Sequence, residues 1–189
     1  IRGWEAWKRG EKIILRRRVE EAERLERLKF EKVQKAKGLV EFIYYQGNEK
    51  WGTPEQVKTW KEIEVGLHNN FKNLNPFEFE EFVAKLFQKM DYKTRNNRKT
   101  GDYGCDVVAW KGDDRIAIQC KKNAEGNLVG NRVVQQTLGS MHKIKANKSL
   151  IVTTSDFTPM AIDQARGAPI ELWDKRDLHK MVRKYFIET

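Results

Sequence analysis

The residues best suited to chemistry are an acid at position 106 and an amide and a lysine further along the chain. Asp106 ends a glycine-containing stretch, Thr100-Gly101-Asp102-Tyr103-Gly104-Cys105, which predicts a tight turn that delivers Asp106 rigidly to the start of a strand. Gln119 and Lys121 are two apart in the next predicted strand, so their side chains share one face of the sheet. Because burying such a polar set is costly without a purpose, the pattern predicts one site built from Asp106, Gln119 and Lys121.

This residue set suits the hydrolysis of a phosphodiester. The reaction needs an attacking water, neutralisation of the phosphate oxygens and stabilisation of the departing alkoxide, which one or two Mg²⁺ ions can provide. Oxygen donors such as the Asp106 carboxylate are the ligands that Mg²⁺ prefers. Lys121 would bring positive charge to the phosphate and would either orient or deprotonate the water. The residues alone leave these two roles open.

The elements that must position the site begin with a helix at residue 76. Asn75-Pro76-Phe77-Glu78 combines a capping residue, a proline at the first helical position and an acid three residues after the cap. Apolar residues then follow at helical spacing: Phe79, Val83, Leu86, Phe87 and Met90.

After this helix the apolar period changes to that of strands. The patterns predict strands at 92–97, 106–110, 115–120 and 150–153, and helices at 131–144, 159–166 and 177–186. Together with a short strand before the last helix, this order predicts an α/β fold with three layers around a mixed sheet.

The N-terminal part has a different character. Residues 4 to about 37 are dense in charge with i, i+4 pairs, which predicts an exposed helix. Residues 39–46 are apolar and fit either a strand or the end of that helix, and residues 47–52 predict a turn before a further helix capped by Thr53. We therefore expect a mainly helical, charged region over 1–74 and a catalytic domain over 75–189.

The amino-acid composition indicates which binding partners and which cellular compartment fit the chain. Lysine and arginine number 37 against 27 acidic residues, and the net charge of +10 favours a polyanion such as nucleic acid. No apolar run approaches the roughly 18 residues of a membrane span. The 2 cysteines, Cys105 and Cys120, fit neither a disulfide framework nor a zinc site, so we expect buried thiols in a reducing, cytoplasmic setting.

These motifs, taken in order, resemble a known family. Phe79-Glu80, the stretch from Gly101 to Asp106, Gln119-Cys120-Lys121 and Gln135 to Gly139 are similar to Mrr-like restriction endonucleases of the PD-(D/E)XK superfamily. Val152 to Pro159 looks like the family's strand and helix after the catalytic motif. The resemblance covers roughly residues 75 to 182.

The resemblance implies a restriction-endonuclease-like fold and Mg²⁺-dependent cleavage of DNA, with Mn²⁺ as a substitute. It implies catalytic positions at Asp106, Gln119 and Lys121, with Glu80 assisting and Gln135 matching the glutamine of the next helix. Asp106, Gln119 and Glu80 would bind the metal. Gln119 stands where the wider superfamily usually has an acid, which leaves Glu80 as the natural second carboxylate and Glu81 as the weaker alternative.

The leading hypothesis is an endonuclease that restricts foreign DNA. One alternative is a structure-selective nuclease of repair or recombination, which would use a similar core. Another is a DNA-binding module that keeps the fold without turnover, motivated by Gln119 and the long charged helix. A homodimer is expected, because cutting both strands with one site per chain calls for two copies.

Overall fold

The computed structural model describes residues 2–97 and 104–188, with side chains of the first helix described from Glu11 onward. The chain divides into two compact units, residues 1–60 and 61–189, and the division falls within helix α2 (Pro54–His68). The predicted domain boundary after residue 74 stays a prediction. The turn predicted from Thr100 to Tyr103 lies outside the described residues.

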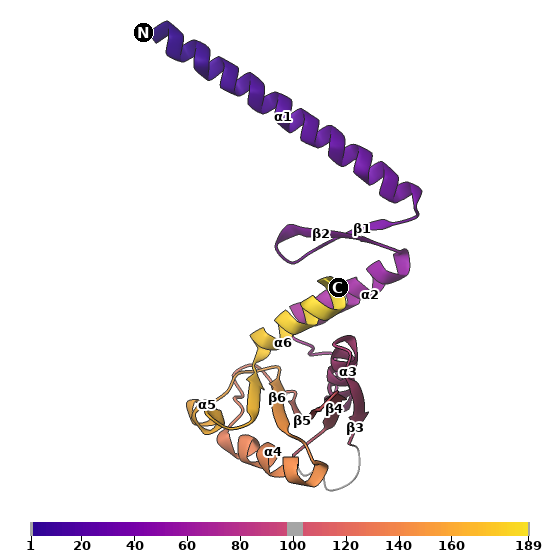
Figure 1. Cartoon of the computed structure of the whole chain (residues 1–189), viewed down its shortest axis with the longest axis vertical. Coiled ribbons are helices and arrows are strands. Elements are labelled where there is room, and N and C mark those ends of the chain that lie inside the picture. The colour runs from indigo at the N-terminus through magenta and orange to yellow at the C-terminus, as the bar shows by residue number, and fades with distance from the viewer. Residues whose placement is uncertain (1, 98–103, 189) are drawn as a thin grey trace. The chain divides into compact units, whose positions relative to one another are not determined.

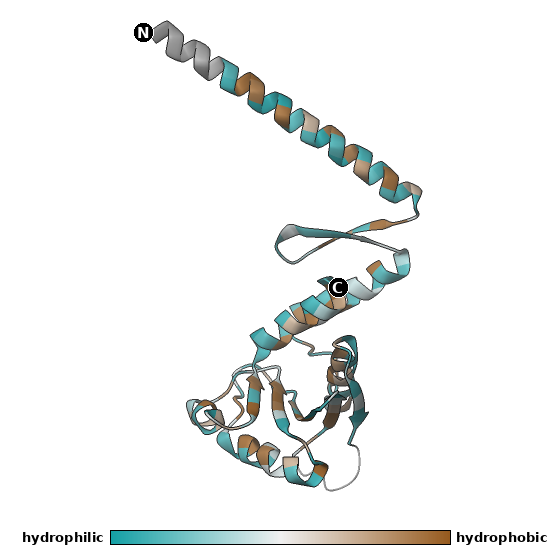
Figure 2. Ribbon diagram, viewed as in Figure 1, coloured by the Kyte–Doolittle hydropathy of each residue, from teal (hydrophilic) through white to brown (hydrophobic). Residues whose placement is uncertain are grey.

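The first unit begins with a long charged helix and continues with a hairpin. Helix α1 (Arg2–Ala36) carries exposed apolar residues scattered among its charges (Figure 2). Strands β1 (Val40–Tyr44) and β2 (Asn48–Gly52) pair antiparallel across a 3-10 turn, η1 (Tyr45–Gly47). The strand alternative for residues 39–46 is therefore correct.

The turn predicted over residues 47–52 is wrong, because most of it is strand β2. The chain reverses earlier, where Gln46 and Gly47 both have positive φ, 59° and 77°. Gly52 then lies against Trp60, since a Cβ added at Gly52 would overlap the Trp60 ring. Trp60 is buried, as its helical position predicts, and its ring centroid is 5.6 Å from that of Phe42.

In chain order, the core of the second unit starts with helix α3 (Pro76–Lys89). This helix begins at the predicted capping signal. Asn75 accepts a hydrogen bond from the main-chain N–H of Glu78, and the Glu78 carboxylate accepts one from the main-chain N–H of Asn75. This capping box satisfies two donors at the helix start. It sets the helical phase that buries Phe79 completely and places Glu80 at the next position.

A five-stranded mixed sheet forms the centre of the second unit (Figure 1). Its strands lie in sequence order: β3 (Lys93–Asn96), β4 (Val107–Lys111), β5 (Asp114–Lys121), β6 (Lys148–Thr153) and β7 (Ile170–Trp173). The pairs β3–β4 and β4–β5 are antiparallel, whereas β5–β6 and β6–β7 are parallel. The sheet therefore changes its pairing mode at β5, which carries Gln119 and Lys121.

Helices cover both faces of this sheet, so the predicted three-layer α/β fold is confirmed. Helices α3 and α6 (Lys175–Val182), the latter extended by the π-helical turn η2 (Arg183–Glu188), pack on one face. Helices α4 (Asn131–Ile144) and α5 (Pro159–Ala165) pack on the other. The core on that second face contains these buried residues: Val129, Val134, Ile151, Phe157, Ala161 and Ile170.

None of the helices formed by residues 2–97 and 104–188 combines the length and the apolar character needed to span a bilayer.

Gly104 lies close to the main chain of helix α4. Its φ is +80°, and an added Cβ would lie 2.7 Å from the carbonyl oxygen of Gln136. A left-handed conformation costs a non-glycine residue roughly 1–2 kcal/mol, and the contact with α4 backbone adds to that cost. We expect Gly104→Ala to lower the free energy of unfolding in urea by more than about 2 kcal/mol.

Gly126 is the matched control, because its φ is +82° and no described atom lies within 4 Å of the added Cβ. Gly126→Ala should show the conformational cost alone, roughly 1–2 kcal/mol. Equal losses in the two variants would contradict the close approach of α4 to the turn.

Candidate active site

Asp106 is a buried carboxylate held by donors of the neighbouring strand. It directly precedes β4 and is 6% exposed, and its main-chain N–H donates to the carbonyl oxygen of Ile118 at 2.8 Å. Its side-chain Oδ2 accepts a hydrogen bond from the main-chain N–H of Cys120 at 2.7 Å and another from Nε2 of Gln119. Buried charge is tolerated when donors surround it, so these bonds explain why this acid stays in the core.

Gln119 and Lys121 come from the last residues of β5 and share one face of the strand. Gln119 is 5% exposed, whereas Lys121 is half-buried. Because Nε2 of Gln119 bonds to Asp106, its amide oxygen is the end that can bind a cation. The structure therefore brings Asp106 and Gln119 into direct contact and places Lys121 at the adjacent end of the strand.

The pKa of the Cys120 thiol depends on burial and on charged residues of the neighbouring elements. Burial is the largest cause that raises its pKa, and the negative charges of Asp106 and then Glu80 raise it further, while Lys121 lowers it. Glu80 lies half-buried on α3, one position after the fully buried Phe79. The pKa of Cys120 thus responds to two carboxylates and one ammonium, which come from α3, the residue before β4 and β5.

Both cysteines are buried, as their pattern predicts. Burial raises the pKa of Cys105 to about 11, and Cys105 packs with Val108 and Ala117 under α4. Neutral buried thiols behave as small apolar residues rather than as nucleophiles.

Gln135 stands apart from this group in its described contacts. It lies on α4 with an exposed side chain, and its amide nitrogen is 3.5 Å from the side-chain oxygen of Gln164 on α5. The structure does not join it to Asp106 or Gln119 by a described hydrogen bond. The assignment of Gln135 to the site therefore stays a prediction.

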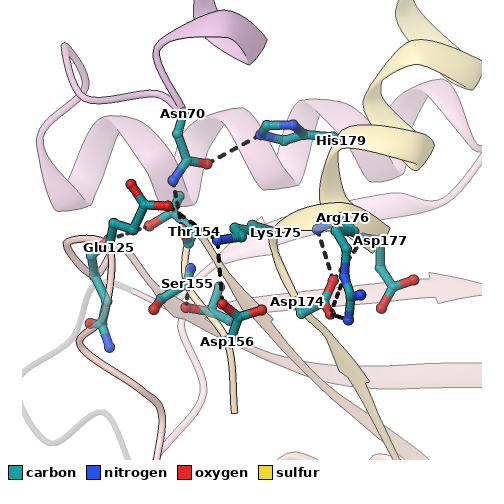
Figure 3. A network of polar contacts seen from close by, with 12 residues as sticks. Asn70, Glu125, Thr154, Ser155, Asp156, Asp174, Lys175, Arg176, Asp177 and His179 are labelled. Atoms are coloured by element: carbon teal, nitrogen blue, oxygen red, sulfur yellow. Dashed lines mark hydrogen bonds and ion pairs between the residues drawn. The ribbon is translucent and has the colours of Figure 1, made fainter.

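A polar network that the sequence did not single out lies where β6 ends (Figure 3). Thr153 Oγ1 donates to the carbonyl oxygen of Lys121 at 2.8 Å, and the main-chain N–H of Thr154 donates to the same oxygen at 3.2 Å. Thr154 Oγ1 donates to the carbonyl oxygen of Asn123 at 2.8 Å. The sequence carries one signal for this, the run Thr153-Thr154-Ser155 at the end of an apolar strand.

The comparison with known families decides the assignment. The family model Mrr_cat, described as a restriction endonuclease, matches residues 71–182, more than half of the chain. The chain belongs to the Mrr-like restriction endonuclease family. The match begins before α3 and ends with α6, so it spans the whole five-stranded sheet and both helical layers. The predicted family is thus confirmed, and the chain carries a nuclease domain of the hydrolase class.

Solved structures agree on the fold. The DNA modification-dependent restriction endonuclease AspBHI is 22% identical, with a TM-score of 0.53 over 73% of this chain and 37% of its own. AF1548, a protein of unknown function, is 21% identical, with a TM-score of 0.50 over 60% of this chain and 66% of its own. The chain thus spans between about a third and two thirds of these proteins' lengths. No curated protein matches the chain.

The donor atoms at the site fit a divalent cation, which this family generally uses. Asp106 offers a carboxylate oxygen beside the amide oxygen of Gln119, and hard cations prefer such oxygen ligands. Glu80 stays a prediction as the third ligand. Within the described residues, no three His, Cys, Asp or Glu side chains are grouped to hold a metal.

Cys120 can report which acid of α3 belongs to the site. In a Cys105→Ala background, Glu80→Gln removes a negative charge that raises the pKa of Cys120, so the thiolate should form at lower pH. We expect the pH midpoint of labelling by methyl methanethiosulfonate to fall in this variant. Glu81→Gln is the matched control and should leave the midpoint unchanged; an equal shift in both variants would remove the preference for Glu80.

Proposed function

We propose that the chain is a metal-dependent DNA endonuclease that hydrolyses phosphodiester bonds in the restriction of foreign DNA, with Mg²⁺ as its cofactor. Residues 75–189 form the catalytic domain in this proposal. The observation that carries it is the buried Asp106 carboxylate in contact with Gln119, beside Lys121, in a chain of a restriction endonuclease family. Glu80 and Gln135 complete the proposed set.

In this proposal each residue has a defined task. Asp106, Gln119 and Glu80 hold the cation through oxygen atoms. The bound cation supplies positive charge to the phosphate oxygens and lowers the cost of forming hydroxide from water. Lys121 places its ammonium beside a phosphate oxygen and orients the attacking water, so that a new P–O bond forms as the bond to the departing sugar oxygen breaks.

The charge of the chain supports a nucleic-acid substrate. The net charge of +10 attracts a polyanion and speeds its association at low salt. AspBHI, which shares the fold, is by name dependent on modified DNA, so methylation belongs among the conditions of the test. A symmetric homodimer would give the two active sites that a double-strand cut needs.

Plasmid cleavage tests the proposal. The purified chain is incubated with supercoiled and linear plasmid, methylated and unmethylated, with Mg²⁺, Mn²⁺ or EDTA. We expect nicking with either metal and none with EDTA. Asp106→Ala and Lys121→Ala should each lower the rate by at least about 100-fold, because the first removes a proposed ligand of the cation and the second the cationic group beside the phosphate.

Lys122→Ala is the matched control, since it removes the same charge at the next residue along the chain, just after β5 ends, where the proposal assigns no role. It should cleave within about threefold of the unchanged chain, well below the cost of losing a catalytic group. Cleavage confined to branched substrates would favour the repair or recombination role. Metal-independent DNA binding without cleavage of any substrate would favour a binding module.

A further inference from the structure

A strained turn follows α2 and is held by packing. Asn70 and Phe71 have φ values of 52° and 55°, so two consecutive non-glycine residues adopt the left-handed conformation. Such residues cost roughly 1–2 kcal/mol each and persist where the surroundings fix them. Phe71 is 2% exposed, and its ring centroid lies 4.8 Å from that of Phe82. The packing of Phe71 therefore holds its neighbour Asn70 in place.

Asn70 uses both ends of its side-chain amide. Its Nδ2 donates to the main-chain carbonyl oxygen of Thr154 at 2.6 Å, and its Oδ1 lies 3.1 Å from Nε2 of His179 (Figure 3). These contacts join residues 84 and 109 positions apart in the chain. A carboxamide held at both its nitrogen and its oxygen fixes geometry at both of its partners.

His179 presents a donor to this amide. Burial is the main cause that lowers its pKa, and the positive charges of Arg183 and then Lys175 lower it further. The ring is therefore neutral at pH 7, and because Oδ1 of Asn70 is an acceptor, Nε2 carries the proton. The ring also meets Phe71 edge to face, with centroids 5.9 Å apart.

From Thr154 the network reaches the proposed catalytic lysine. Thr153 and Thr154 both donate to the carbonyl oxygen of Lys121, and Thr154 also bonds to Asn123. The main chain is thus held on both sides of Lys122. Thr153 and Thr154 are 0% and 1% exposed, so water does not compete for these bonds.

We propose that Asn70, oriented by His179, is a positioning residue that fixes the main chain at Lys121 and so aims its ammonium at the phosphate bound beside Asp106. This inference rests on the proposed nuclease function. Asn70 does not touch the reacting atoms, so its loss changes the rate through Lys121. Displacement of a reacting group by about 1 Å can cost 100-fold in rate.

Asn70→Asp tests this with almost no change of size. The new carboxylate still accepts a hydrogen bond from His179 but cannot donate one to the Thr154 carbonyl oxygen. A carboxylate oxygen instead faces and repels that carbonyl oxygen. We expect kcat for plasmid nicking to fall at least about tenfold, with KM and the Kd for DNA in Ca²⁺ changed less than twofold. Asn70→Gly, which keeps the left-handed turn without strain, should show the same loss.

Two controls separate positioning from stability. Asn73→Asp makes the same chemical change at an exposed residue of the same segment and should leave kcat unchanged. His179→Gln keeps an N–H donor and should retain kcat, whereas His179→Leu should lower it as Asn70→Asp does. A lower Tm with unchanged kcat in Asn70→Asp and Asn70→Gly would overturn the proposal.

A second readout does not depend on cleavage. In ¹³C-labelled protein, Asn70→Asp should shift the side-chain Cε signal of Lys121, and the amide of Thr154 should exchange faster with deuterium. If the unchanged chain cuts no DNA, the proposed function fails, and these signals still decide the positioning role. Unaltered Lys121 and Thr154 signals in Asn70→Asp would contradict it.

Discussion

The buried carboxylate of Asp106 is the constraint on which the arrangement of this domain depends. A charge that is 6% exposed requires donors at fixed places, and here they are the main-chain N–H of Cys120 and the side chain of Gln119. Both donors belong to β5, so these hydrogen bonds fix the pairing register between the start of β4 and the end of β5. A shift by one residue would turn Gln119 to the opposite face.

Strand β5 pairs in a different way on each of its edges, and each pairing positions a different residue. On the β4 edge, antiparallel pairing supplies the contacts of Asp106. On the β6 edge, parallel pairing brings Thr153 level with Lys121, and the threonine hydroxyl then binds the lysine carbonyl. One strand therefore sets the orientation of the acid and of the lysine separately, whereas the proposed third ligand, Glu80, belongs to α3 on the face opposite α4.

Local signals in the sequence predicted much of this fold, whereas contacts between distant residues stayed hidden. The capping box at Asn75 and the cap at Thr53 depend on neighbouring residues, and both occur as expected. Strand β2 was missed because its residues 48–50 are polar, and its place depends on pairing with β1. Nothing local marks Asn70 as a bridge, since its partners are set by tertiary packing, and the contact of Gln135 with Gln164 depends on how two helices meet.

The change of pairing at β5 also bears on the order in which the site assembles. The β4–β5 hairpin closes through a turn at residues 112–113, whereas the β5–β6 pair must first enclose α4. Loop closure costs more entropy over the longer segment, and parallel pairing is intrinsically slow. Gln119 can thus meet Asp106 in a folding chain before Lys121 has its threonine support. The two halves of the proposed active site would then belong to different stages of folding, which the folding and unfolding rates of variants in each half can distinguish.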